Sequence, residues 1–177
     1  SNIPLSENSK TKPINEYGSS KLKGEIACLK NDSNSIVIRT SWLYSSFGKN
    51  FVKTMISLMK NNNSVKVVND QIGSPTYAND LAKFIIEIIM NSKNKSGLFH
   101  YSNEGEISWF EFAKSIKELY NLDCEIIGVS SKEFKTIAKR PKYSLLNKSK
   151  IKKTFNLDIP NYKQSLENCI KVIKNEV

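Results

Sequence analysis

Tyr17 and Lys21 are the residues of this chain whose types and spacing could do chemistry. Residues four apart on an α-helix share a face and lie about one turn from each other. An ammonium beside a phenol favours the phenolate, so such a tyrosine could donate and accept a proton near neutral pH. The pair suits an enzyme that reduces a carbonyl group. The spacing alone is weak, because about one such pair is expected by chance in this lysine-rich chain.

The residues around the pair predict the helix that would carry it. Pro13 disfavours an earlier helix start. Beyond it, apolar residues recur at helical spacing and predict a stripe that faces the core: Leu22, Ile26 and Leu29, with Cys28 beside them. A surface helix with scattered lysines is the alternative that the spacing leaves open.

Strand and helix patterns alternate along the rest of the chain. Residues 35–40 are a β-branched run, apolar on both faces, which is typical of a buried parallel strand. Residues 73–76 read as a loop. Further strands are predicted at 65–68 and 97–101. Amphipathic helices are predicted over 48–60 and 165–174. Two more helices are predicted to begin at Ala78 and at the capping box formed by Ser108 and Glu111. The helix from Ala78 is apolar most of the way round and is expected to be buried. The alternation predicts an α/β fold with parallel strand pairing.

Length and composition are those of a soluble globular protein. The chain has 177 residues, of which 39% are apolar and 25% charged, enough for one domain or parts of two. No apolar run reaches the length of a membrane span, and the N-terminus shows no signal-peptide pattern. Cys28, Cys124 and Cys169 are widely spaced and odd in number, which predicts reduced, buried thiols and no metal site. These features indicate a cytoplasmic protein without a membrane partner.

The formal net charge of +10 raises the question of nucleic-acid binding. Only Arg39 and Arg140 are arginines, and the lysines are spread along the chain. Nucleic-acid binders favour arginine forks and interleaved aromatic residues, and both are missing here. A basic binding module is therefore a weak alternative, and no nucleic-acid partner is expected.

Seven segments, in order, resemble the dTDP-4-dehydrorhamnose reductase family of the extended short-chain dehydrogenases/reductases. The resemblance runs from about residue 4 over nearly the whole chain. The segments are 15–25 (NEYGSSKLKGE), 39–44 (RTSWLY), 48–55 (GKNFVKTM), 70–77 (DQIGSPTY), 100–105 (HYSNEG), 108–113 (SWFEFA) and 140–144 (RPKYS).

The resemblance implies a reaction and roles for the first site residues. Members of the family use NADPH, some also NADH, to reduce the 4-keto group of dTDP-4-dehydro-L-rhamnose to dTDP-L-rhamnose. Tyr17 would deliver the proton to the substrate oxygen, and Lys21 would hold the nicotinamide ribose and keep Tyr17 poised. Thr40 and Ser41 end the buried strand where a nicotinamide would lie, at a strand carboxyl end. Trp42 would form an apolar wall against the sugar.

Four further residues match family positions in the nucleotide-sugar cleft. Asn50, Gln71 and Thr76 are expected to line it, and the Arg140 guanidinium could fork onto the pyrophosphate. His100, the single histidine, is expected to be structural rather than catalytic.

The resemblance also implies what this chain lacks. It matches the C-terminal part of the family, without the N-terminal dinucleotide-binding half and its glycine-rich phosphate turn. The expected division is a loop over 1–13, a Rossmann-type helix and strand over 14–47, a substrate-lobe segment over 48–77, a return to the sheet over 78–101, and the substrate lobe with C-terminal helices over 102–177. The expected fold is thus the C-terminal part of a doubly wound Rossmann-like sheet interleaved with a small α/β substrate lobe.

Activity is accordingly expected of an intact parent protein and not of this chain alone. The expected partners are the dTDP-sugar, the missing half and, as an open alternative, a second copy in a homodimer. Magnesium is a further open alternative for the intact protein, with no ligands identified. An apolar surface left uncovered by the missing strands would make the chain self-associate or only marginally stable.

Two other functions fit the same fold. A non-catalytic regulatory subunit resembling the methionine adenosyltransferase β family could keep the Tyr17–Lys21 pair as part of a binding site. A nucleotide-sugar epimerase or dehydratase would oxidise and re-reduce its substrate with tightly held NAD.

Overall fold

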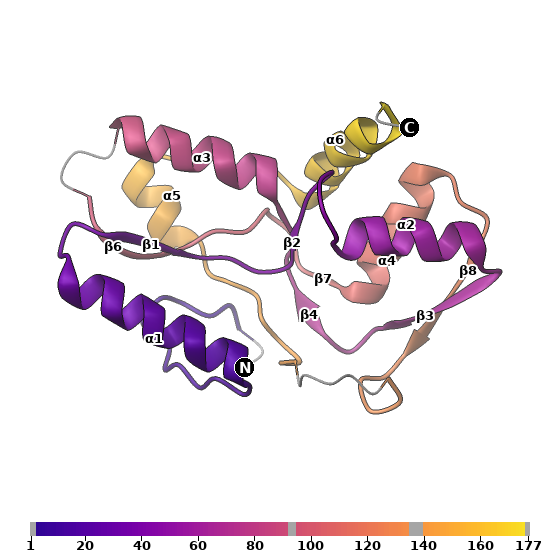
Figure 1. The fold of residues 1–177 in the computed structure, drawn as a ribbon, viewed down its shortest axis with the longest axis horizontal. Helices are drawn as coiled ribbons and strands as arrows, with labels where there is room; N and C mark the ends of the chain where they lie inside the picture. Colours follow the sequence, from indigo (N-terminus) through magenta and orange to yellow (C-terminus); the bar gives the residue numbers. More distant parts are fainter. Residues whose placement is uncertain (1–2, 92–94, 135–139, 176–177) are drawn as a thin grey trace.

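The chain has the predicted α/β architecture, in which helices alternate with mostly parallel strand pairs. The computed structural model describes residues 3–91, 95–134 and 140–175. Figure 1 shows two parts side by side, which meet near the short strand β2 (Leu43–Tyr44).

The first part is built on a parallel strand pair, as predicted. β1 (Ile36–Arg39) and β6 (Gly97–His100) pair with Ile36 opposite Gly97. In the view of Figure 1, α1 (Glu16–Asn31) lies below this pair, and α3 (Ala78–Asn91) and α5 (Ser149–Phe155) lie above it. The pair therefore has helices on both sides, as in a doubly wound sheet.

The second part contains three more strand pairs and three helices. Its strands pair as β2 with β5 (Thr76–Tyr77) and β3 (Ser64–Val68) with β8 (Glu125–Val129), both parallel, and β4 (Ile72–Gly73) with β7 (Ile107–Ser108), antiparallel. Its helices are α2 (Phe51–Asn61), α4 (Trp109–Tyr120) and α6 (Tyr162–Asn175). The loop predicted over 73–76 is wrong at its ends, because β4 and β5 are strands of two residues, too short to show a period in the sequence.

Each part has its own apolar core. In the second part, α2, α4 and α6 surround a buried cluster that includes Val52, Phe112 and Leu166. In the first part, Phe84 and Phe99 pack with Ile151 of α5. Helix α5 thus packs on the β1–β6 pair, although it lies within residues 102–177 of the chain.

The core-facing stripe predicted for α1 is wrong in part. No residue of α1 is fully buried, Ile26 is 55% exposed, and the thiol of Cys28 is exposed rather than buried. The physical reason is that α1 contacts β1 along one narrow side, which leaves Leu22 and Leu29 half-buried. Cys124 and Cys169 are buried, as predicted.

The prediction that the helix from Ala78 is buried is also wrong. Phe84 and Ile88 of α3 face the core, whereas Ile86, Ile89 and Met90 are 58%, 75% and 76% exposed. One side of the helix covers the β1–β6 pair, and the opposite side is an apolar stripe in contact with water. Apolar stripes of this kind mark surfaces that associate.

We expect the chain to self-associate through the exposed stripe of α3. Replacing Ile89 and Met90 together by lysine should shift the sedimentation coefficient toward the monomer in analytical ultracentrifugation. The melting temperature should change little, because these side chains lose no core packing. The matched control is Phe47→Lys, which removes an apolar side chain that is 73% exposed and lies outside α3, in the loop before α2. A wild-type chain that is monomeric at high concentration would contradict this expectation.

Candidate active site

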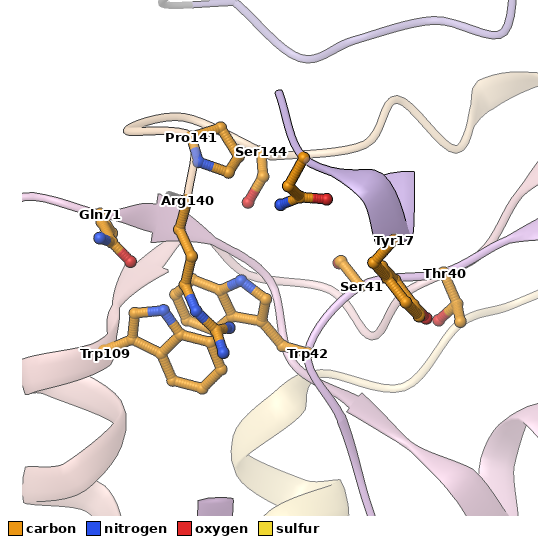
Figure 2. A pocket seen from close by; sticks show the side chains of 10 residues that line it. Tyr17, Thr40, Ser41, Trp42, Gln71, Trp109, Arg140, Pro141 and Ser144 are labelled. Carbon is orange, nitrogen blue, oxygen red and sulfur yellow. The ribbon is translucent and has the colours of Figure 1, made fainter. Parts of the chain in front are cut away.

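Two adjoining pockets, called the two lobes of the cleft from here on, form an open cleft lined by residues from both parts of the molecule. Their cavity volumes are about 560 and 760 Å³. Figure 2 shows two indoles in the middle, overlapped by the Arg140 side chain in this view, with Tyr17 and Thr40 on one side and Gln71 on the other. The residues that line both lobes are Tyr17, Thr40, Ser41, Trp42, Gln71, Trp109 and Arg140.

Tyr17 lies in the first turn of α1, and its side chain lines the cleft. The helix begins there because the Asn15 side chain accepts a hydrogen bond from the Gly18 N–H at 2.8 Å, which caps its N-terminus. Tyr17 is 72% exposed, and the Lys21 Nζ lies 5.4 Å from the centroid of its ring. The shared helix face predicted for the pair is therefore confirmed, with a cation over the ring of the phenol.

Glu25 is the next residue along the same helix face, and it ties α1 to the sheet. Its two carboxylate oxygens accept hydrogen bonds from the Arg39 Nε at 2.7 Å and Nη2 at 2.6 Å. Two parallel bonds fix orientation as well as distance. The pair therefore sets the rotation of α1 and directs Tyr17 toward the carboxyl end of β1.

Thr40 and Ser41 follow β1 and form the wall of the cleft beside Tyr17. The Thr40 hydroxyl donates to the Thr76 hydroxyl at 3.0 Å, and the Ser41 hydroxyl donates to the Ser74 carbonyl at 2.8 Å. Both hydroxyl protons are thus committed to the protein. A ligand can still approach the oxygen lone pairs and the backbone of this wall.

Trp42 and Trp109 form a stacked pair in the centre of the cleft. Their ring centroids are 3.7 Å apart with an angle of 13° between the planes, and Phe51 packs on Trp109 at 4.5 Å. A Cβ at Gly73 would lie 2.8 Å from the Trp42 ring, so glycine is required there for the indole to fit. The two indoles together form an apolar wall of the cleft, and the contact of Trp42 with a sugar stays a prediction.

Arg140 and Gln71 both line the cleft, Gln71 on the side away from Tyr17. Gln71 is 7% exposed and precedes β4. The segment that follows Arg140 is bound to the same strand, because the Ile72 N–H donates to the Lys142 carbonyl at 2.7 Å and the Ser144 N–H to the Ile72 carbonyl at 2.9 Å. This ladder brings Arg140 next to the cleft from about seventy residues farther along the chain.

Asp70 holds a second segment against the larger lobe. Its carboxylate accepts hydrogen bonds from the Ser131 N–H and hydroxyl, both at 2.8 Å. Burial by itself raises the pKa of the Asp70 carboxyl, but the bonds from Ser131 and the charge of Lys142 outweigh it and hold the pKa below its ordinary value. The ionised carboxylate thus anchors the turn that carries Phe134 to the wall of this lobe.

Two residues predicted to line the cleft, Asn50 and Thr76, instead bond to neighbouring segments of the protein. Asn50 caps α2, with its Oδ1 accepting from the Lys53 N–H at 3.2 Å and its Nδ2 donating to the Ser45 carbonyl at 2.7 Å. Thr76 is fully buried behind Thr40 and Ser41. Neither is among the residues that line the two lobes.

Trp109 is the most central of the site residues that the sequence analysis did not predict. It lies in the segment 108–113 that was matched as a motif, directly after the capping residue Ser108. A tryptophan at the start of an amphipathic helix is more often part of the core, so no local signal separated the two roles. The larger lobe adds Lys66 and Phe134, which come from distant segments.

The described residues contain neither a cluster of metal-ligating side chains nor a helix that could span a membrane. Within residues 3–91, 95–134 and 140–175, no group of three or more histidine, cysteine or acidic side chains could hold a metal ion. No helix in the same ranges is long and apolar enough to cross a bilayer. His100 has a structural setting, as predicted: it is 1% exposed, and its Nδ1 lies 3.1 Å from the Leu5 carbonyl oxygen.

Comparison with known proteins finds several relatives named dTDP-4-dehydrorhamnose reductase. A protein from Sinorhizobium fredii named dTDP-4-dehydrorhamnose reductase is 38% identical over 180 residues, which cover 95% of this chain and 60% of that relative. The crystal structure of a dTDP-4-dehydrorhamnose reductase from Clostridium acetobutylicum is 36% identical with a TM-score of 0.93, and the match covers 98% of this chain and 61% of that one.

A third similar protein was solved with a dinucleotide. The dTDP-4-dehydrorhamnose reductase from Bacillus anthracis, in complex with NADP, is 41% identical with a TM-score of 0.91 over 96% of this chain and 59% of that one. This chain therefore spans about 60% of the length of the relatives it matches. The RmlD substrate binding domain family matches over residues 1–175, and the chain belongs to that family.

Proposed function

We propose that this chain is the sugar-nucleotide-binding and proton-donating part of an NAD(P)H-dependent dTDP-4-dehydrorhamnose reductase. The observation that carries the proposal is the position of Tyr17, with Lys21 over its ring, at the mouth of a cleft walled by two indoles and an arginine. The names of the relatives that are 36–41% identical support the same reaction.

Tyr17 is the proton donor in this proposal. Reduction of a keto group needs a hydride at carbon and a proton at oxygen, and the Tyr17 phenol gives the proton to the oxygen. The exposure of this side chain at the cleft supports that role. The Lys21 ammonium lies over the ring of this phenol. The Glu25–Arg39 pair keeps the phenol directed at the cleft throughout.

The two lobes divide the substrate between them. The sugar lies against Trp42 beside Tyr17, and the pyrophosphate lies at Arg140, which lines both lobes. The larger lobe, with Phe51, Leu58 and Phe134 in its wall, receives the thymidine. Its apolar and aromatic lining suits a planar base that carries a methyl group.

The residues present fit one end of a nicotinamide dinucleotide. Tyr17 and Lys21 would hold the ribose hydroxyls, with Thr40 and Ser41 forming the surface beneath the ring. When bound, the dinucleotide supplies the hydride. The chain has seven glycines and no Gly-x-Gly-x-x-Gly turn, so the pyrophosphate anchor has to come from a dinucleotide-binding unit outside this sequence.

The other candidate functions have less support. A regulatory subunit would need the fold and a binding site but no exposed phenol in the cleft. Measuring NADPH consumption distinguishes a reductase from an epimerase or a dehydratase, because the latter two reactions consume no net NADPH. Net oxidation of NADPH with formation of a single product by the parent protein would exclude them.

Calorimetric titration tests the proposal on this chain directly. We expect dTDP-L-rhamnose to bind to the chain alone and NADPH to bind weakly or not at all. UDP-glucose, which differs in base and sugar, is the control ligand and should bind more weakly. If dTDP-L-rhamnose shows no binding heat at any temperature tested, the chain does not carry the sugar-nucleotide site and the proposal is wrong.

A further inference from the structure

Trp42 has a backbone conformation that bulky residues rarely adopt. Its φ is +48°, in the left-handed region, at the point where the chain leaves β1 and enters β2. A tryptophan stays there only where neighbouring groups offset the conformational cost. The contacts that do so identify what holds the aromatic wall of the cleft in place.

Thr76 makes those contacts. Its backbone N–H donates to the Trp42 carbonyl at 3.2 Å, and its hydroxyl donates to the Ser41 carbonyl at 2.6 Å. The same hydroxyl accepts the proton of the Thr40 hydroxyl at 3.0 Å. Fully buried Thr76 thus binds three consecutive residues of the wall, two through its hydroxyl and Trp42 through its backbone N–H. Its loss would leave the part-buried Ser41 carbonyl without this donor.

Thr76 is itself held from behind by Asn103, which is also fully buried. The Tyr77 N–H donates to the Asn103 Oδ1 at 2.7 Å, and the Asn103 N–H donates to the Pro75 carbonyl at 3.1 Å. These bonds on both neighbours of Thr76 leave the segment little freedom to shift. The position of Thr76 is therefore fixed by the core, and the position of Trp42 follows from it.

We propose that Thr76 is a positioning residue of this site, which holds Trp42 in its left-handed conformation and its indole flat against Trp109 before any ligand binds. A wall that is already formed costs a ligand less ordering on binding. The proposed effect on the stacking rests on the contacts of Thr76 and is independent of the proposed function, whereas the effect on sugar-nucleotide affinity rests on the proposed function.

Nuclear magnetic resonance of Thr76→Val and Thr76→Ser tests the proposal on this chain. The chain has two tryptophans, so the two indole N–H signals and the contacts between the two rings can be assigned with Trp42→Phe and Trp109→Phe. Valine keeps the shape but removes the hydroxyl, and we expect the indole–indole Overhauser contacts to be lost. Serine keeps the hydroxyl and should restore them. The Kd for dTDP-L-rhamnose should rise about tenfold in Thr76→Val and return in Thr76→Ser.

Ile170→Val is the control for a general loss of stability. Ile170 is 2% exposed in α6, and the loss of one methylene should lower the melting temperature without moving the indole signals. A folded Thr76→Val with unchanged indole contacts would overturn the proposal, and so would their loss in Thr76→Ser. If the wild-type chain binds no dTDP-L-rhamnose, the proposed function fails while the indole contacts still decide the role of Thr76.

Hydrogen exchange of the wild-type chain supplies a test that needs no folded variant. If the Thr76 N–H is bonded to the Trp42 carbonyl, it should exchange as slowly as the amides of the β3–β8 pair. Exchange as fast as that of exposed loop amides would show that the bond is not kept, and the proposal would be wrong.

Discussion

Tyr17→Phe should lower the rate of keto-sugar reduction about a thousandfold in a parent protein that joins this chain to a dinucleotide-binding unit, because a positioned general acid contributes about 10²- to 10⁴-fold. Phenylalanine keeps the ring beneath the Lys21 ammonium and removes only the group that donates the proton. Steady-state rates of NADPH oxidation with the keto sugar, compared between the two proteins, measure the effect.

The control for Tyr17→Phe is ligand binding by the isolated chain. Because Tyr17 is 72% exposed and its hydroxyl is not needed to shape the cleft, dTDP-L-rhamnose should bind the variant within about twofold of wild type. Tyr120→Phe, on α4 away from the cleft, should leave the rate unchanged. A Tyr17→Phe enzyme that keeps more than a tenth of the rate would rule out Tyr17 as the proton donor.

Arg140→Ala should weaken the binding of dTDP-L-rhamnose about thirtyfold. A guanidinium that forks onto a pyrophosphate makes short, charge-assisted bonds, and removing it leaves the phosphate charge without its partner. Arg140 lines both lobes, so in the proposed arrangement it contacts the group that joins sugar and nucleoside. Calorimetric titration of the isolated chain gives the ratio of the two Kd values.

Two variants separate a direct contact of Arg140 from a general effect of charge. Lys142→Ala removes another cation two residues away, whose side chain is 73% exposed, and should change the Kd less than threefold. Arg140→Lys keeps the charge without the fork and should recover part of the affinity. Equal losses in Arg140→Ala and Lys142→Ala would mean that no specific bond to the pyrophosphate exists.

The stripe of α3 shows why burial was predicted less well than secondary structure. Periodicity identifies a helix from local spacing, and α3 begins at Ala78 as expected. Whether Ile89 and Met90 are covered depends on what packs against the helix from elsewhere, and the pattern of the helix itself contains no record of that. The exposed thiol of Cys28 has the same explanation.

The strands and helices with strong periods, the Tyr17–Lys21 pair and the family could all be predicted from the residues and their order. These depend on residues within one or two helical turns of each other, or on ordered motifs along the chain. Three relations became visible only in the folded molecule: Trp109 stacks on Trp42, Arg140 reaches the cleft through a ladder with Ile72, and Thr76 lies behind the wall instead of in it. Those relations join segments 30 to 70 residues apart, where the side-chain types alone do not say which atoms will meet.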